Sequence, residues 1–162
     1  MKEFRFPYRE KNHRLAPELY RGGNIIAFTI CIKDKESFFT SNDIFAVFEE
    51  VLLQELKSKD CLAYVYLFMP NHAHLLFSGN DPKADIKNCL ERFKQRTGYW
   101  LYKNTKNIRW QKDYYDHILR GNDDLFAQTK YILNNPVRAG LVNYWKEYPY
   151  KGSTIYNFRD WE

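Results

Sequence analysis

Two histidines one residue apart are the first candidates for chemistry in this sequence. His72 and His74 lie in the segment HAHLLF, which has the residue types of a β-strand. Successive strand residues alternate between the two faces of a sheet, so we expect both imidazoles on the same face. Two imidazole nitrogens can hold one metal ion and leave positions for a third protein ligand, water and a substrate oxygen. Because an isolated pair is more often surface or packed histidine, metal binding needs a further ligand.

A tyrosine and an asparagine are candidates for the rest of such a site. Tyr131 and Asn135 are four residues apart in a segment with helical periodicity, which predicts that they share one face of a helix. The amide oxygen of Asn135 can bind a divalent cation, and the Tyr131 hydroxyl can act as a nucleophile through a covalent intermediate. The alternative is structural. Tyr131, one of 13 tyrosines in the chain, would then only fill the flank of a helix, and Asn135 would cap the helix before Pro136.

Hydrophobic periodicity and turn residues predict the elements that position these side chains. We expect strands at 24–32, 61–69, 72–77 and 114–119. Helices are expected from Ser41 to about 57, from the Asp81–Pro82 pair past 101, and from about 124 to 134 or 135, where Pro136 ends the last one. The apolar stripes of the first two helices should be buried, and they comprise Phe45, Phe48, Leu52 and Leu56, then Ile86, Leu90, Phe93 and Leu101.

The order of these elements is β-α-β-β-α-β-α, which matches the split βαβ, or ferredoxin-like, pattern with one additional helix. The sequence therefore predicts an α+β fold with a four-stranded antiparallel sheet and two crossover helices on one face. Such a fold leaves the function open.

The composition limits the class of protein. The chain has 162 residues, 44% hydrophobic and 28% charged, which fits a single domain over 1–162. Cys31, Cys61 and Cys89 form neither a zinc pattern nor a disulfide framework, so we expect reduced thiols. No apolar run approaches the roughly 20 residues of a membrane helix, and the N-terminus is charged. We therefore expect a cytoplasmic protein with no membrane partner.

Charge and aromatic content favour an anionic partner, with nucleic acid as the leading candidate. The formal net charge is +5, and 18% of the residues are aromatic. In the 1–21 segment, cations alternate with the rings of Phe4, Phe6, Tyr8 and Tyr20, a mixture suited to phosphate neutralisation and base stacking. The DNA contacts that we expect are Arg5, Arg9, Lys11, Arg14, Arg21 and Tyr8. The basic residues of the second helix are less favoured, and the aromatic 143–162 tail should pack over the domain or a ligand.

The strand-like segment YYDHIL contains two rival tyrosines and another histidine. Tyr114 and Tyr115 are adjacent, so they point to opposite faces, and no metal ligand follows them at helical spacing. We expect them to pack or to stack on bases. His117 is open: a hydrogen-bonded sheet histidine is the favoured interpretation, with support of a metal ligand or a DNA contact as the alternatives.

Two separated motifs give the chain a resemblance to a known family. The segments PNHAHLL (70–76) and YILNNPVRAGLV (131–142) resemble those of the REP-associated tyrosine transposases, members of the single-tyrosine HUH transposase superfamily. The resemblance covers most of the chain, including Arg14-Leu15, Tyr20-Arg21-Gly22, Trp110-Gln111, the 114–117 segment and the aromatic tail.

The resemblance implies a complete catalytic site. By it, His72, His74 and Asn135 hold a divalent ion, Mg²⁺ or Mn²⁺, and Tyr131 forms a 5′-phosphotyrosine link with single-stranded DNA that carries an imperfect hairpin. Family members often have a bulky apolar residue between the histidines, where this chain has Ala73. Because residue 73 faces the other side of the sheet, we expect little chemical effect. The tail resembles that of the branch that acts as monomers, so we expect a monomer, with a dimer as the alternative.

Three functions can be separated by experiment. The favoured one is a metal-dependent single-stranded DNA endonuclease and strand transferase, a transposase. A ferredoxin-like sheet with exposed aromatic residues also describes proteins that bind single-stranded RNA or DNA without cutting it. A metal-dependent phosphodiesterase that uses water would form no covalent adduct. The sequence has no G-x-x-x-x-G-K-[ST] loop, which agrees with an ester exchange that needs no nucleotide triphosphate.

Overall fold

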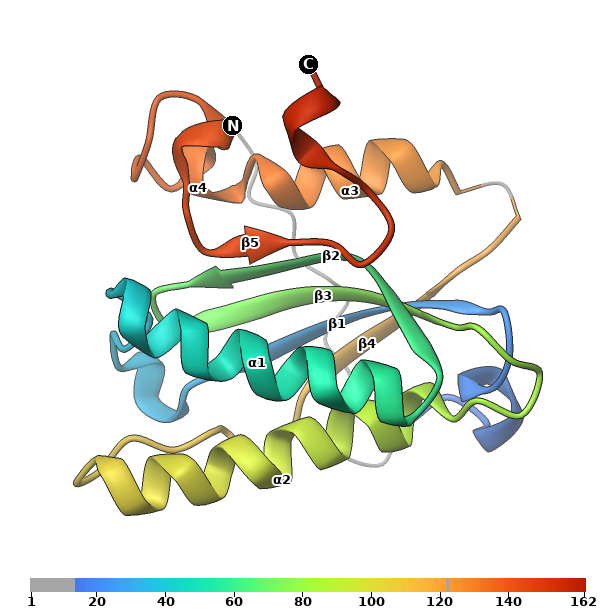
Figure 1. Cartoon of the computed structure of the whole chain (residues 1–162), viewed down its shortest axis with the longest axis horizontal. Helices are drawn as coiled ribbons and strands as arrows, with labels where there is room; N and C mark the ends of the chain where they lie inside the picture. Colours follow the sequence, from blue (N-terminus) through green and yellow to red (C-terminus); the bar gives the residue numbers. More distant parts are fainter. Residues whose placement is uncertain (1–13, 122) are drawn as a thin grey trace.

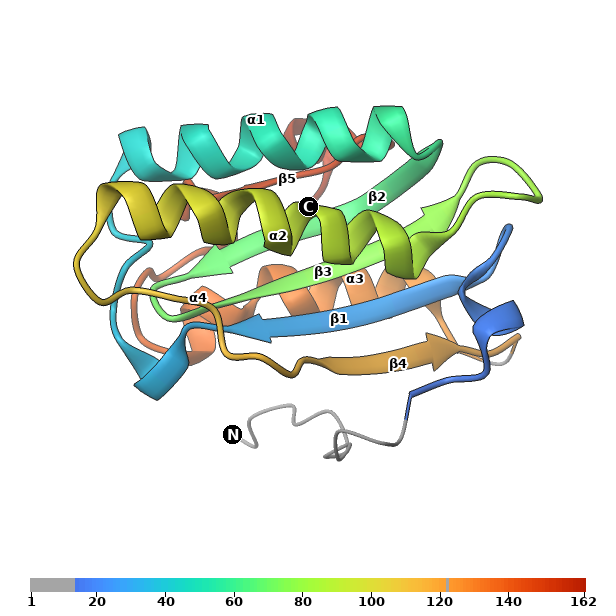
Figure 2. The same cartoon turned by 90° about the horizontal axis from the view of Figure 1, so that it is seen from below.

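A five-stranded antiparallel sheet with helices on both faces organises the chain (Figures 1 and 2). The computed structural model describes residues 14–121 and 123–162. The strands have the order β4-β1-β3-β2-β5, and their bounds are β1 Ile25–Cys31, β2 Cys61–Met69, β3 His72–Gly79, β4 Tyr115–Leu119 and β5 Lys151–Gly152. The first four strands form the antiparallel ferredoxin-like arrangement, so the predicted α+β fold is confirmed. The predicted count of four strands was one too low, because β5 has only two residues and no alternation to detect.

Two long helices cover one face of the sheet. They are α1 (Asn42–Ser58) and α2 (Ile86–Asn104), which lie side by side in front of the strands in Figure 2. The N-terminus of α1 is capped by Ser41, whose Oγ accepts a hydrogen bond from the Ile44 N–H at 3.3 Å. Both predicted apolar stripes are buried against the sheet, as expected.

The predicted start of the second helix at Asp81–Pro82 was wrong. The helix begins at Ile86, and its cap is Asp85, whose Oδ1 accepts from the Asn88 N–H at 3.0 Å. Asp81 instead closes a turn, accepting from the N–H groups of Lys83 and Ala84 at 2.8 and 2.9 Å. An Asp-Pro pair suits either a turn or a helix start, and here a second aspartate four residues later takes the capping position.

The opposite face carries α3 (Leu125–Leu133), the short α4 (Asn135–Arg138) and the C-terminal tail. Ile132 and Leu133 of α3 form a second core with Leu67 and Leu76 of the sheet, and the tail adds buried side chains to it. Short 3-10 turns complete the path: η1 (Pro17–Tyr20), η2 (Lys33–Lys35), η3 (Trp145–Glu147) and η4 (Phe158–Asp160). Both faces of the central strands are therefore covered, and β1 and β3 read as nearly continuous buried runs. In the described ranges, no helix is long and apolar enough to cross a membrane.

Candidate active site

The two histidines meet at the end of β3 that follows the Pro70–Asn71 turn. His72 pairs with Cys31 of β1 and His74 with Thr29, so both side chains lie on the face that carries α3. The two Nε2 atoms are 3.1 Å apart. At metal–nitrogen distances of about 2.1 Å, two adjacent ligands of one ion have a similar separation. The sheet therefore presents two converging imidazole nitrogens, as the spacing predicts.

Each imidazole is held at its other nitrogen. His72 Nδ1 lies 2.6 Å from Asn71 Oδ1, and His74 Nδ1 lies 3.2 Å from Thr29 Oγ1. Since an amide oxygen only accepts hydrogen bonds, the proton of a neutral His72 sits on Nδ1 and the lone pair on Nε2. Fixing the ring through its distal nitrogen is the usual way in which proteins orient a metal-binding histidine.

Burial keeps His74 neutral. Its side chain is 6% exposed, and desolvation, followed by the charges of His72 and Arg138, holds the pKa of His74 well below its ordinary value. A neutral imidazole is the form that binds a metal ion.

Tyr131 and Asn135 do not share one continuous helix, contrary to the expectation from their spacing. Helix α3 ends at Leu133, and α4 starts at Asn135, with Asn134 as the residue between them. Pro136 lies in the first turn of α4, so a short helical segment continues past the residue at which we predicted a stop. Its ring has no N–H and cannot extend the hydrogen-bond ladder of α3.

Arg138 bridges the two segments. Its Nη2 atom donates to the Tyr131 carbonyl oxygen at 2.7 Å and to Asn135 Oδ1 at 2.8 Å. Its guanidinium carbon lies 3.7 Å from the centroid of the Tyr131 ring, in cation–π geometry. The contact to a carbonyl in the last turn of α3 also places a cation at the negative end of that helix.

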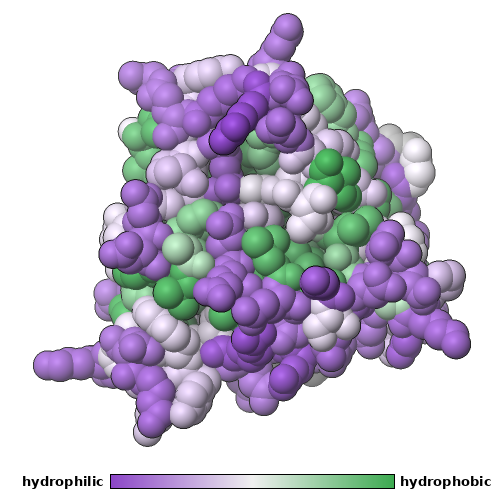
Figure 3. Space-filling view, in the orientation of Figure 1, coloured by the Kyte–Doolittle hydropathy of each residue, from purple (hydrophilic) through white to green (hydrophobic). Residues whose placement is uncertain are grey.

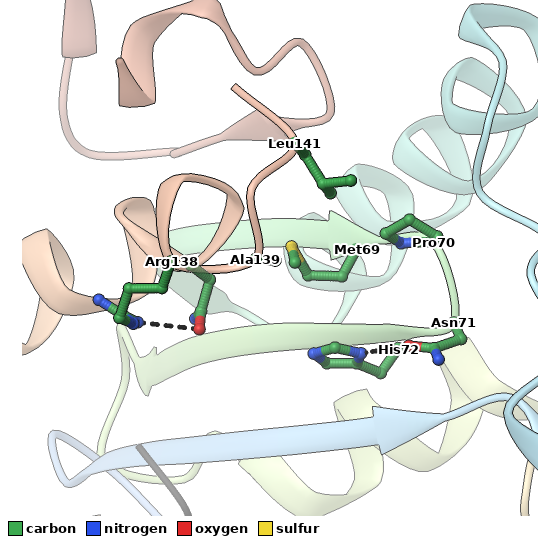
Figure 4. Close-up of a pocket in the computed structure, with 8 residues that line it drawn as sticks. Met69, Pro70, Asn71, His72, Arg138, Ala139 and Leu141 are labelled. Atoms are coloured by element: carbon green, nitrogen blue, oxygen red, sulfur yellow. Dashed lines mark hydrogen bonds between the residues drawn. The ribbon is translucent and has the colours of Figure 1, made fainter. Parts of the chain in front are cut away.

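A cavity of about 350 Å³ brings these groups together (Figure 4). His72 and Asn71 reach it from β3 and the preceding turn, and Asn135 and Arg138 reach it from α4. His74 adjoins the cavity through its 3.1 Å approach to His72. Tyr131 does not line the cavity; it is half-buried and contacts Arg138, which does.

The donor set fits a divalent cation. Two imidazole nitrogens and one amide oxygen are borderline to hard ligands, which suit ions such as Mn²⁺ and Mg²⁺ when water completes the shell. In the ranges that the structure describes, no cluster of three His, Cys, Asp or Glu residues could hold a metal ion. A third protein ligand at the histidine pair therefore has to be of another type, and the Asn135 amide is of that type.

Of the cations expected to contact DNA, Arg14 and Arg21 lie within the described residues. Arg5, Arg9, Lys11 and Tyr8 lie outside the described residues. Arg14 forms an ion pair with the buried Asp116 at 3.5 Å, and its guanidinium stacks over Tyr114 at 3.8 Å. Its charge thus has a structural partner.

The remaining residues of the N-terminal segment differ in exposure. Tyr20, expected among the stacking rings, is 1% exposed and hydrogen bonds to Asp116, so its ring belongs to the core. Arg21 is exposed and pairs with the half-exposed Asp85 at 3.7 Å.

The rival tyrosines and the third histidine lie on β4 and just before it. Tyr114 is 6% exposed and packs edge-on against Phe28 in the core of α1 and α2. Tyr115 and His117 pair with Thr29 and Ala27 of β1, on the same face of the sheet as the histidine pair. His117 is one strand removed from β3, beyond β1.

Sequence reasoning missed three residues that orient the site. Asn71 could have been suspected from the sequence, because it directly precedes His72 in the turn and its side chain is therefore close to that of His72. Arg138 follows Asn135 by three residues and could have been suspected on helical spacing. Thr29 has no local signal, because the pairing of β1 with β3 alone brings it to His74.

Comparisons with known proteins identify the family of the chain. The family model described as "Transposase IS200 like" matches residues 24–135, more than half of the chain. A putative REP-associated tyrosine transposase of Haemophilus influenzae is 27% identical over 139 residues, covering 79% of this chain and 78% of that protein. The REP-associated tyrosine transposase of Escherichia coli is 20% identical over 131 residues, covering 81% and 77%.

A solved structure shares the fold. It is that of a REP-associated tyrosine transposase bound to a REP hairpin, and it superposes with a TM-score of 0.69 at 20% sequence identity. The match covers 93% of this chain and 82% of that chain. The shared feature is therefore the fold of most of the chain.

Proposed function

The chain belongs to the IS200-like transposase family, and from that premise we propose that it cuts and rejoins single-stranded DNA at hairpin-bearing repeats through a 5′-phosphotyrosine intermediate. The observation that carries the proposal is the convergence of the His72 and His74 Nε2 atoms, 3.1 Å apart, beside a cavity that Asn135 also lines. The relative solved with a REP hairpin supports a hairpin-bearing DNA as the partner.

His72, His74 and Asn135 are the residues that would hold a divalent ion, Mg²⁺ or Mn²⁺. Such an ion polarises a phosphodiester and offsets the negative charge that develops in its transition state. The protein residues fix its ligands in advance: Asn71 and Thr29 orient the imidazoles, and Arg138 orients the Asn135 amide. This preorganisation avoids rearrangement during the reaction.

Tyr131 is the proposed nucleophile. Its Oη forms a bond to phosphorus, the bond from phosphorus to the DNA 3′ oxygen breaks, and that oxygen leaves with the bonding electrons. The phenol loses one proton and the departing oxygen gains one, so the step is balanced. Because one phosphate ester replaces another, the reaction is reversible, and attack by a second 3′-hydroxyl completes strand transfer.

Arg138 keeps the nucleophile and the metal ligand in register. The stack on the Tyr131 ring and the hydrogen bonds to the Tyr131 carbonyl and the Asn135 amide make these two residues one unit across the break between α3 and α4.

A covalent-adduct assay tests the proposal. The protein is incubated with Mn²⁺ and labelled single-stranded DNA that contains an imperfect hairpin, and labelled protein is sought after denaturation. We expect an adduct with the wild type, none with Tyr131→Phe, and a wild-type yield with Tyr144→Phe, which alters an exposed tail tyrosine. His74→Ala should lose the adduct as chelation does.

Other outcomes identify the alternatives. Cleavage without an adduct would indicate a phosphodiesterase that uses water, and tight binding without cleavage would indicate a binding module. An adduct that persists in Tyr131→Phe but disappears in Tyr114→Phe or Tyr115→Phe would show that the nucleophile is assigned to the wrong tyrosine.

A further inference from the structure

Three adjoining hollows lie beside the C-terminal half of α2, on the opposite side of the sheet from the candidate active site. Their volumes are about 420, 390 and 440 Å³. Arg109 lines all three, while Lys33 and Lys112 each line two of them. We call this surface the basic groove and define it by Lys33, Tyr102, Lys106, Arg109 and Lys112.

The basic groove has more cations than carboxylates. Lys33, Lys106, Arg109 and Lys112 are exposed, and the ion pairs of the described ranges involve none of them. Asp34, Glu36 and Glu91 also line the hollows, so the local charge is a positive excess and not a uniform field. In Figure 3, hydrophilic side chains project from the lower left, where α2 ends in Figure 1.

The segment that carries Arg109 and Lys112 is fixed from beneath. Trp110, 9% exposed, inserts into the core and donates from Nε1 to Thr97 Oγ1 at 2.9 Å. Lys94 Nζ donates to the carbonyl oxygens of Gln111 and Lys112 at 3.0 and 3.3 Å. The two surface cations therefore extend from an ordered backbone, which lowers the entropy lost when they bind a ligand.

An exposed aromatic ring lies within the basic groove. Tyr102 lines the same hollow as Lys33, Lys106 and Arg109, yet 77% of its surface is exposed. Tyr99, one turn earlier on α2, is 63% exposed. Solvent-exposed rings beside cations are the combination with which proteins bind single-stranded nucleic acid, through base stacking and phosphate contacts.

Backbone pairing connects the basic groove to the histidine pair. Cys31 pairs with His72, and the next residue, Ile32, donates to the Asn71 carbonyl oxygen at 2.9 Å and bridges to Trp110. The Lys33 N–H then donates to the Arg109 carbonyl oxygen at 2.9 Å. Two strand spacings of about 4.8 Å separate β3 from the segment of Arg109, roughly 10 Å in all. Figures 1 and 2 both show η2 and the end of α2 at the same end of the sheet as α4.

We propose that the basic groove binds the single-stranded DNA that flanks the cleaved phosphate, holding its backbone with Lys33, Arg109 and Lys112 and one base on Tyr102. The proposal rests on the proposed function and adds a path for the strand, around the end of β1 and away from the cavity of His72. DNA is favoured over a protein partner because the hollows combine unpaired cations with an exposed ring.

Binding without chemistry tests the path. Fluorescence anisotropy in EDTA compares a labelled oligothymidine strand with a labelled hairpin that lacks single-stranded extensions. The groove variant is Arg109→Gln with Lys112→Gln, and the matched control is Lys57→Gln with Lys83→Gln, which removes the same charge from exposed positions elsewhere. Tyr102→Leu removes the ring, and Tyr102→Phe retains it.

We expect the groove variant to bind oligothymidine about tenfold more weakly at physiological salt than the control does. Its slope of log affinity against log salt should be less steep by about 1.4, since each lost phosphate contact on a single strand contributes about 0.7. Tyr102→Leu should weaken binding about fivefold or more, while Tyr102→Phe binds normally. Binding of the hairpin without extensions should be unchanged in every variant.

Equal oligothymidine affinities for the groove and control variants would overturn the proposal. An equal loss for the hairpin without extensions would also overturn it, because the groove would then contact duplex. The adduct assay reports separately on the proposed function: a wild type that forms no adduct but binds oligothymidine through the groove would refute the chemistry and leave the strand site standing.

Discussion

At the scale of single residues, the candidate site depends on side chains that never carry the reaction themselves. His72 and His74 converge because Asn71 and Thr29 hold their distal nitrogens. Arg138 does the same for the amide of Asn135 and the backbone of Tyr131. Partners of this kind typically change metal affinity or activity 10- to 100-fold when they are removed.

Arg138→Lys separates the charge of this residue from its geometry. A lysine keeps the cation but has no planar guanidinium to stack on Tyr131 while it bonds to two acceptors. We expect adduct formation to slow about 10- to 100-fold and Mn²⁺ affinity, followed by the paramagnetic resonance signal of free Mn²⁺, to weaken. Arg120→Lys, in the exposed turn after β4, is the control and should match the wild type. Unchanged rate and affinity in Arg138→Lys would show that positive charge alone suffices.

The residues of the site were predictable to different degrees. The histidine pair follows from strand alternation, a local rule that needs no tertiary information. The placement of Tyr131 and Asn135 on one helix was wrong, because the spacing rule assumes an unbroken ladder and Pro136 interrupts it. Thr29 could not be predicted, since its contact to His74 arises from strands more than 40 residues apart in the sequence.

At the scale of elements, sequence patterns located the long segments and missed the short ones. The stripes of α1 and α2 have many periodic positions, so their identification was secure. The start of α2 depended on a single dipeptide, Asp81–Pro82, which forms a turn. The two-residue β5 is defined by its partners Tyr66 and Leu67 in β2, not by its own residues.

The turn before α2 depends on a close approach between backbones at Gly79. The Gly79 N–H donates to the Gly22 carbonyl oxygen at 2.9 Å. A Cβ at position 79 would lie 2.4 Å from that oxygen and 2.9 Å from the Ala84 Cβ. We expect Gly79→Ala to lower the free energy of unfolding by about 1 to 3 kcal/mol, because backbone must move to admit the methyl group.

Gly23→Ala is the matched control for Gly79→Ala. It alters a neighbouring glycine with nothing within 4 Å of the added Cβ. Urea denaturation of both variants measures the difference in unfolding free energy. Equal stabilities would mean that the turn can shift at little cost and that the approach at Gly79 is not a constraint.

At the scale of the whole molecule, two hydrophobic cores separate the two proposed DNA-contacting sides. One core joins the sheet to α1 and α2, and the other joins it to α3 and the tail. The candidate active site opens on the α3 side and the basic groove on the α2 side. Both sites depend on the end of β1, which pairs with β3 and with the segment of Trp110. The order of the elements predicted that α1 and α2 cover one face of the sheet. The path of residues 105–114 has no periodicity from which it could be predicted.

Lys94 links this path to the stability of the whole domain. Burial, then the charge of Arg14, lowers its pKa to about 8, although its ammonium group donates to two carbonyl oxygens. Below pH 8 both the folded and the unfolded chain bind this proton, so the folded state bears the full cost of a buried charge. Between pH 8 and the unfolded pKa of about 10.4, the unfolded chain binds more protons, so stability rises with pH.

Comparison with Lys94→Met isolates this contribution from other titrating groups. We expect the unfolding free energy of the wild type, relative to that of Lys94→Met, to increase by about 1 to 2 kcal/mol as the pH rises from about 7.5 to 10, after allowance for partial solvent screening. Denaturant titrations at several pH values measure it, with the exposed Lys57→Met as the variant whose difference should stay constant. A difference for Lys94→Met that is flat or falls over this range would mean that the ammonium group is well solvated. The segment that carries Arg109 and Lys112 would then lack the buried support that orders the basic groove.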